Sequence, residues 1–465
     1  GDASVYLFGK NGEAPNDSIL YKNLNIHYYD KLQVRPNMLY RWMNYQQFVR
    51  SKQMRASNRT RLYSQYRQEQ VQEKLSQLGI FSYMDMQYAP RDTTAACDTL
   101  DVTMQATFAK PLDAELELNV VTKSNDQTGP GASFGVTRNN VFGGGESWNV
   151  KLKGSYEWQT GGGEKSSLMN SWEMGLSTSL TFPRVVFPHL GKREFDFPAT
   201  TTFRLYINQL NRAKYYKLLS FGGNATYDFQ PSRTSRHLFL FQAGNFQLQS
   251  AEFKEIAEAN PALYVSLRNQ FIPAMEYTYT YDNASGRRIK NPIWWQSTVT
   301  SAGNITSLIY RAFGKPFNEE DKSLLGAPFA QFVKLNTELR HLWNIDKNNA
   351  IASRVAVGAL FTYGNATIAP YSEQFYVGGA NSIRAFTVRS VGPGGYHPEE
   401  GKYSYLDQTG TFRFEANVEY RFRIFKSFWG ATFLDAGNVW LLRKDRKLLA
   451  DGKEARPNPI SVHDQ

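Results

Sequence analysis

Residues 411–425 have the sequence Thr-Phe-Arg-Phe-Glu-Ala-Asn-Val-Glu-Tyr-Arg-Phe-Arg-Ile-Phe, and this stretch decides the class of fold. Apolar or aromatic side chains occupy the even positions from 412 to 424, and charged or amide side chains occupy the odd positions between them. A period of two predicts a β-strand with one apolar and one polar face. Strands of soluble sandwiches usually run roughly five or six residues, whereas about ten residues cross a bilayer at a tilt. The stretch therefore favours a membrane-spanning strand.

The same alternation recurs along the chain, most clearly in residues 148–158, 171–182 and 333–340. Tryptophans stand near the ends of several such segments, as expected for the aromatic girdles of a membrane barrel. Connections between the segments alternate between short turns and long loops, which is typical of a barrel with one periplasmic and one extracellular rim. The pattern predicts about 13 strands, near residues 112–124, 131–140, 147–160, 169–182, 199–211, 215–230, 236–249, 271–282, 291–304, 329–345, 350–363, 411–425 and 428–443.

Composition excludes several other classes of protein. Apolar runs are only a few residues long, far short of the ~20 that a transmembrane helix needs. The net charge is +11, but the basic residues are scattered through alternating segments, which argues against nucleic acid as a partner. The single cysteine, Cys97, excludes an internal disulfide and a cysteine-based metal cluster. The six histidines form no HExxH spacing and no nucleophile elbow, so we predict no catalytic residue, metal site or cofactor.

The first part of the chain has a different pattern. Residues 21–110 predict a small α+β domain with a strand at 24–28, a helix starting at Pro36, a longer helix at about 60–78, and two strands at 80–88 and 99–109. Gly79 stands where a left-handed helix cap is expected. Residues 1–20 are interpreted as the end of a preceding domain or a linker, and residues 111–465 as the barrel.

A long loop, roughly residues 364–410, contains the stretch Tyr-Val-Gly-Gly-Ala-Asn-Ser-Ile-Arg-Ala-Phe at positions 376–386. Glycine allows close backbone approach, and arginine offers a fixed fork of donors to carboxylates. This mixture predicts a loop that folds back into an enclosed space. An odd number of strands leaves an unpaired edge, which a membrane does not tolerate. Because residues 444–465 form a polar stretch, we expect about three further strands to be missing and the barrel to be truncated.

Two motifs resemble the BamA/TamA superfamily. Residues 75–81, Leu-Ser-Gln-Leu-Gly-Ile-Phe, resemble the helix-to-strand junction of POTRA domains. The loop residues match the Gly-Gly-x-x-Ser-Val-Arg-Gly-Phe pattern of the superfamily's sixth extracellular loop, with alanine in place of the second-last glycine; they are Gly378, Gly379, Ser382, Ile383, Arg384, Ala385 and Phe386. The turn at 187–193 and the long loops most resemble a TamA-like member from Bacteroidetes. The resemblance implies an antiparallel, roughly 16-stranded transmembrane β-barrel preceded by a POTRA domain.

In this superfamily the loop arginine pairs with carboxylates on two neighbouring strands, and the matching positions here are Glu419 and Asp435. Glu419 lies on the polar face of its predicted strand, in agreement. The face of Asp435 is left open by the pattern, because Phe433 shares its parity; a bulge would place Asp435 inward.

The resemblance further implies a bacterial outer-membrane protein with its POTRA domain in the periplasm, which inserts or translocates outer-membrane proteins. The implied partners are unfolded outer-membrane protein clients, outer-membrane lipid and accessory assembly subunits. One alternative is a two-partner-type secretion pore for a specific passenger. An outer-membrane enzyme is a more remote alternative, because the six histidines form no nucleophile elbow and no HExxH spacing. A passive porin is also remote, because it needs neither an N-terminal periplasmic domain nor an inward arginine loop.

Overall fold

The computed structural model of the protein describes most of the chain, which divides into two compact units. The first unit holds residues 1–116 with segments 134–151 and 178–186, and the second holds the remainder. The described residues are 2–43, 65–92, 99–122, 127–159, 171–186, 199–212, 216–249, 270–284, 289–317, 322–324, 327–365, 369–395 and 408–442. The turn at 187–193, the tail at 444–465 and Cys97 lie wholly or partly outside these ranges.

The N-terminal domain contains a five-stranded sheet with strand order β2-β3-β1-β5-β4. Its elements are β1 (Ala3–Phe8), β2 (Asp17–Tyr21), β3 (Leu24–Tyr28), α1 (Pro36–Met43), α2 (Gln65–Gln77), β4 (Phe81–Pro90) and β5 (Leu100–Phe108). The two helices and strands β3, β4 and β5 occur where the sequence predicts them, whereas β1 and β2 were not predicted. Residues 60–64 of the longer predicted helix lie outside the described ranges. Gly79 has φ of 64° and ends the α2 turn in the left-handed conformation.

The structure corrects the interpretation of residues 1–20. Strand β1 lies in the centre of the sheet, parallel to both β3 and β5, so this segment belongs to the same domain. The physical reason is its alternation: Val5 and Leu7 are fully buried and pack in one core with Leu39 of α1 and Leu75 of α2. Removing these side chains from water stabilises the strand in a central position.

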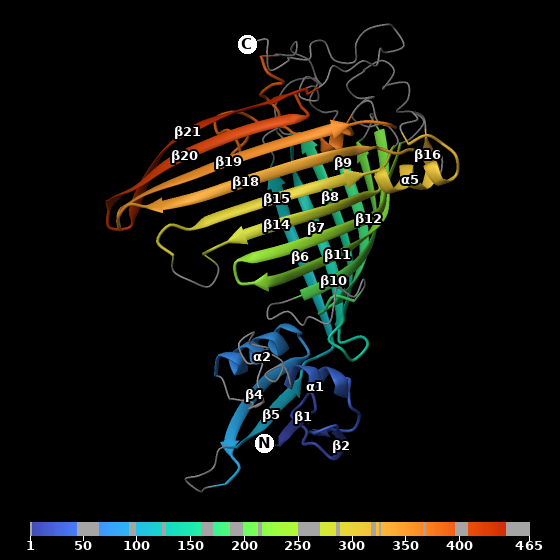
Figure 1. Ribbon diagram of the computed structural model, residues 1–465, viewed down its shortest axis with the longest axis vertical. Coiled ribbons are helices and arrows are strands. Elements are labelled where there is room, and N and C mark those ends of the chain that lie inside the picture. Colours follow the sequence, from blue (N-terminus) through green and yellow to red (C-terminus); the bar gives the residue numbers. More distant parts are fainter. Residues whose placement is uncertain are drawn as a thin grey trace, which may run out of the picture. The chain divides into compact units, whose positions relative to one another are not determined.

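The second sheet has thirteen strands in unbroken antiparallel order from β6 to β21 (Figure 1). Each coincides with one of the predicted segments. They are β6 (Leu112–Thr122), β7 (Gln127–Asn139), β8 (Ser147–Gln159), β9 (Ser171–Phe182), β10 (Ala199–Arg212), β11 (Tyr216–Ser232), β12 (Ser235–Gln249), β14 (Ala274–Asp282), β15 (Ile293–Ala302), β18 (Phe332–Asn344), β19 (Asn349–Thr362), β20 (Phe412–Phe425) and β21 (Phe428–Trp440). The two-residue β13 (Gln270–Phe271) also pairs with β12.

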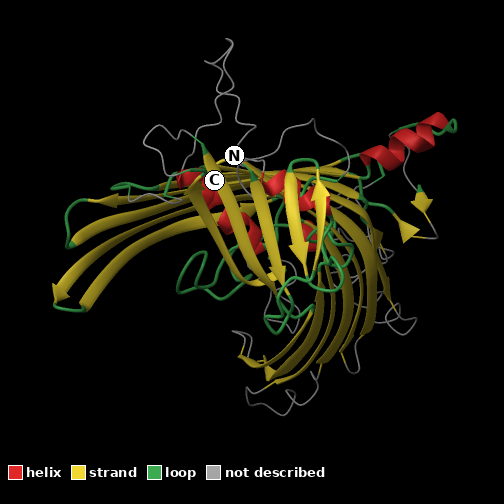
Figure 2. Ribbon diagram, turned by 90° about the horizontal axis from the view of Figure 1, so that it is seen from below, coloured by secondary structure: helices red, strands yellow, loops and turns green. Residues whose placement is uncertain are grey.

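The strands of the second unit curve rather than lie flat (Figure 2), and their two faces differ in chemistry. One face, here called the apolar face, exposes large side chains such as Leu335 and Val418. The opposite face, here called the charged face, carries residues such as Glu415, which is 1% exposed. Within the described ranges, no helix is both long and apolar enough to span a membrane.

Short helices and strands lie in the connections between the strands of this sheet. They are α5 (Asn304–Ala312), β16 (Ser323–Leu324), β17 (Ala327–Pro328) and the 3-10 helix η3 (Tyr371–Glu373). Helix α5 lies in a segment that the sequence analysis treats as part of a long loop; its residues are neither strongly helix-forming nor flanked by a capping side chain.

Candidate functional site: an arginine loop on the charged face

The glycine-rich stretch forms a tight, internally bonded loop tip. Gly378 and Gly379 have φ of 106° and 97°, which L-residues rarely adopt. The Gly378 N–H donates to Ser382 Oγ at 3.0 Å, and the Gly379 N–H donates to the Phe386 carbonyl at 2.8 Å. A Cβ added at Gly378 would stand 2.1 Å from the Thr387 carbonyl oxygen. The backbone geometry therefore requires glycine there.

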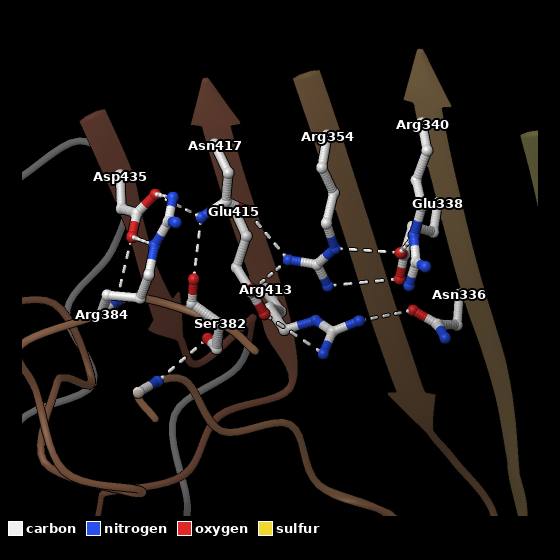
Figure 3. A network of polar contacts seen from close by, with 11 residues as sticks. Asn336, Glu338, Arg340, Arg354, Ser382, Arg384, Arg413, Glu415, Asn417 and Asp435 are labelled. Carbon is white, nitrogen blue, oxygen red and sulfur yellow. Dashed lines mark hydrogen bonds and ion pairs between the residues drawn. The ribbon is translucent and has the colours of Figure 1, made fainter. Parts of the chain in front are cut away.

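Arg384 projects from this loop onto strands β20 and β21 (Figure 3). Its Nε and Nη2 donate to the two carboxylate oxygens of Asp435, each at 2.8 Å, and its backbone N–H donates to Asp435 Oδ2 at 3.0 Å. Its Nη1 donates to Glu419 Oε2. One guanidinium thus contacts a carboxylate on each of two neighbouring strands, and the pair with Asp435 is bidentate.

Asp435 reaches the charged face without a bulge. The β20–β21 pairing is regular from Phe412↔Trp440 to Arg423↔Trp429 and sets Asp435 opposite Asn417. Phe433 stands on the same face because the Arg384 guanidinium lies over its ring, 3.6 Å from the centroid. A stacked guanidinium is attracted by the ring's quadrupole. Phe433, an aromatic residue on the charged face of β21, is therefore the feature of the sequence that indicated a stacked cation.

Asn417 connects the loop backbone to the same carboxylate. Its Nδ2 donates to the Ser382 carbonyl at 2.8 Å and to Asp435 Oδ1 at 2.9 Å. The neighbouring Ile383 is buried and packs with Phe375, Val377, Leu360 and Val439 in one apolar cluster. Polar and apolar contacts thus hold the same loop tip against the sheet.

Two strand glycines make room for these apolar contacts. A Cβ at Gly358 of β19 would lie 2.5 Å from the ring of Phe375, and one at Gly437 of β21 would lie 3.0 Å from Ile383 Cδ1. A glycine within a strand often marks such a close approach.

The charged face continues into an ion-pair network that the sequence analysis did not predict (Figure 3). Arg354 of β19 donates through Nε to Glu338 of β18 at 2.9 Å and through Nη1 to Glu415 of β20 at 2.8 Å. Arg413 lies 3.3 Å from the other Glu415 oxygen and donates to Asn336 at 2.9 Å. Alternation places Asn336, Glu338, Arg413 and Glu415 on the polar faces of β18 and β20. Only the register of β18, β19 and β20 makes them neighbours of Arg354.

Ala385 and Phe386 do not contact these carboxylates. Ala385 has φ of 69°, a conformation that favours glycine, and Phe386 is exposed. Alanine replaces the glycine of the superfamily pattern at position 385, and its left-handed backbone conformation costs about 1–2 kcal/mol relative to glycine.

The geometry suits positioning rather than bond making. Both carboxylates are engaged by guanidinium groups, and Glu419 also accepts from Arg421 at 2.7 Å. Among the described residues, no three histidine, cysteine or carboxylate side chains are grouped as metal ligands. What the site can do is tie a loop to two adjacent strands.

A curved antiparallel sheet with an apolar outer band, charges on the opposite face and an arginine loop defines an outer-membrane β-barrel protein. Residues 140–455 match the Omp85 superfamily domain, and the chain belongs to this superfamily. Its members are non-enzymatic assembly or transport factors, and the chain is a BamA/TamA-type outer-membrane assembly or secretion protein.

Of the solved structures that resemble this chain, BamA shows the same fold. BamA from Haemophilus ducreyi lacking POTRA domains 1–3 aligns with 91% of this chain and 76% of its own, at 13% identity and a TM-score of 0.55. CdiB from Escherichia coli aligns with 97% of this chain and 81% of its own, at 9% identity and a TM-score of 0.40. No curated protein matches the sequence significantly. The Bacteroidetes subtype stays a prediction.

Proposed function

We propose that this protein inserts other β-barrel proteins into the outer membrane, and that Arg384 braces the part of its barrel that must stay closed. The observation that supports the proposal is the simultaneous contact of Arg384 with Glu419 on β20 and Asp435 on β21. Breaking such a pair leaves uncompensated charge in a partly buried site, so the brace resists separation of the two strands.

Clients would first bind the N-terminal domain, which we propose to be a periplasmic POTRA domain. Strands β2 and β4 are the two edges of its sheet. All but the last residue of β2 are exposed, Ile19 and Leu20 among them. An exposed edge with unpaired backbone groups accepts an extended peptide by strand addition.

Strand β6 would then template the client's strands. It is an end strand of the large sheet, and every side chain along it is exposed, including Leu116, Leu118 and Val120. Backbone pairing at this edge needs no covalent chemistry, because each new strand satisfies the amide groups that lipid cannot. The braced β20–β21 pair keeps the opposite part of the sheet in place while this edge is occupied.

The test is depletion of the full-length protein in its own bacterium, followed by quantitative proteomics of the outer membrane. Complementation with wild type, Arg384→Ala, Arg384→Lys and Asn381→Ala then isolates the loop. Asn381 is the matched control, because it is exposed and lies three positions from Arg384 in the same loop. We expect Asn381→Ala to restore the outer membrane and both Arg384 variants to fail, since lysine lacks the bidentate fork.

Each outcome of the depletion points to a different function. Broad loss of β-barrel proteins supports a general insertase. Loss of one secreted passenger alone indicates instead the two-partner type of secretion pore. An outer membrane unchanged by depletion excludes the assembly function, and full rescue by Arg384→Ala excludes the brace.

A further inference from the structure

Helix α5, which is separated from the end of β15 by Gly303 alone, presents an apolar surface away from the protein. Ile305, Leu308, Ile309 and Phe313, the residue that follows the helix, are 53%, 55%, 52% and 84% exposed. Their spacing of three, four and eight residues places them on one side of the helix. A surface helix of a soluble protein has the reverse arrangement, with its apolar side on the core.

Specific polar contacts hold the opposite side of α5 against the sheet and its loops. Ser307 is fully buried and donates to Gln331 Oε1 at 3.0 Å. Asn304 donates to Ser301 Oγ at 2.8 Å and accepts from the Tyr363 hydroxyl at 2.9 Å. Tyr310 donates to the Ser323 carbonyl at 2.6 Å. The inverted orientation is therefore built by hydrogen bonds.

The connection from β15 to α5 is equally restricted. Gly303 joins them with φ of 71°, and its N–H donates to the Pro273 carbonyl at 2.8 Å. A Cβ at this glycine would lie 2.2 Å from the Ala330 carbonyl oxygen. These contacts restrict how the helix leaves the end of the strand; α5 is labelled in Figure 1.

The exposed side of α5 follows directly on the apolar face of the large sheet. Trp295 and Val299 of β15, and Leu335 of the neighbouring β18, are exposed large apolar residues on that face. Because α5 begins where β15 ends, it lies where the apolar band of a barrel meets the headgroup region. In a membrane, lipid covers the apolar band of a barrel, so the same lipid surface is available to the helix.

Two cations accompany the apolar side. Arg311 and Lys315 are both exposed. Helical spacing sets Arg311 beside Leu308, at one margin of the apolar arc. Lys315 follows the end of the helix after Gly314, and its Nζ lies 5.7 Å from the centroid of the Tyr310 ring. Cations flanking an apolar helix face are typical of helices that lie in the plane of a membrane and contact its phosphate groups.

We infer that α5 is an interfacial helix, which inserts Ile305, Leu308, Ile309 and Phe313 among the headgroups and upper acyl chains of the outer membrane and contacts lipid phosphates through Arg311 and Lys315. The inference rests on the outer-membrane location and not on the proposed insertase function. It gives the barrel a lateral anchor at the rim, next to strands β15 and β18.

The experiment uses full-length protein carrying Cys97→Ser, so that single cysteines can be labelled with an environment-sensitive fluorophore. Labels at Leu308→Cys and Phe313→Cys report on α5. Leu335→Cys is the lipid-facing control, and Lys347→Cys, in an exposed turn, is the water-facing control. Heat-modifiable migration in gels verifies that each variant is folded. The proteins are reconstituted into phosphatidylcholine vesicles with and without phosphatidylglycerol, and doxyl-labelled lipid serves as quencher.

We expect labels at 308 and 313 to emit at shorter wavelength than the label at 347 and to be quenched by doxyl groups near the headgroups. Replacing both cations, with Arg311→Gln and Lys315→Gln, should reduce this quenching in phosphatidylglycerol vesicles and not in pure phosphatidylcholine. Water-like, unquenched emission at 308 and 313 in both vesicle types would overturn the inference. The exposed apolar side of α5 would then be a surface for a protein partner. Equal quenching with and without the cations would overturn the phosphate contact.

Discussion

In the N-terminal domain the apolar side chains of strands and helices meet in a closed core, whereas in the large sheet they face outward and the charges are enclosed. Leu7, Leu39 and Leu75 are fully buried in the first region. In the second, Glu415 is nearly inaccessible, while Leu335, on the opposite face of the neighbouring part of the sheet, is 43% exposed. Both regions obey one rule, that apolar surface leaves water; only the surrounding solvent differs.

The largest effect should come from breaking the enclosed charges. Glu415→Ala removes the carboxylate between Arg354 and Arg413 and leaves two cations facing each other. We expect a loss of about 3–5 kcal/mol in the free energy of unfolding, because an uncompensated charge remains in a site poor in water. Denaturant titration of vesicle-embedded protein measures it. The exposed Glu115→Ala is the control, and an unchanged midpoint for Glu415→Ala would contradict the network.

The comparison becomes sharper when the same change is made at two exposed leucines. Leu335→Arg places a charge on the lipid face of β18 and should cost about 2–4 kcal/mol. Leu20→Arg, on the 67% exposed Leu20 of β2, should change stability by no more than about 0.5 kcal/mol, because that surface meets water. Both are read from unfolding midpoints. Similar costs at the two positions would mean that the faces do not meet different solvents.

A smaller effect is expected in the arginine loop. Ala385→Gly relieves the left-handed backbone at φ of 69° and should stabilise the folded loop by about 1 kcal/mol. The Arg384 contacts are unchanged by this substitution, so complementation should be retained. Protease resistance of the loop, compared with wild type and with Gly378→Ala, gives the measurement. A less resistant Ala385→Gly protein would show that the residue is not strained.

The smallest effect concerns the N-terminal domain at acid pH. Hydrogen bonding from Arg91, the largest cause, lowers the pKa of Asp101, and the Asp2 N–H contributes. A lowered carboxyl pKa adds stability that is complete above the unfolded value of about 3.9 and is lost as the pH falls through the folded value. Asp101→Asn should therefore be slightly less stable than wild type at pH 7, and its stability should fall less steeply below about pH 4, so that the two proteins converge in acid. Equal stability at pH 7 together with an equal slope in acid would contradict the contact.

Much of the fold and part of the site followed from the sequence. Period-two alternation located all thirteen strands, because a strand's two faces are a local property of its backbone. The same parity placed Glu419 on the charged face, where Arg384 reaches it. Asp435 came only from the family resemblance, because Phe433 obscured the parity until its stacking with Arg384 was seen.

Non-local pairing had to come from the structure. The central position of β1 depends on its neighbours β3 and β5, the latter nearly a hundred residues away in sequence. The bridge of Arg354 between Glu338 and Glu415 depends on the register of three strands. The outward orientation of α5 depends on hydrogen bonds to Gln331, Tyr363 and Ser323.

By itself, the sequence determined which residues form strands, which face of each strand is apolar, and that the glycine-rich stretch 376–386 carries a single arginine with small neighbours. Those properties depend on spacing along one chain segment. The tertiary structure alone decided which carboxylates that arginine binds, why an aromatic ring shares their face, and which side of α5 meets the surroundings. Those properties depend on the alignment of segments that are far apart in the sequence, and alternation along one strand contains no information about that alignment.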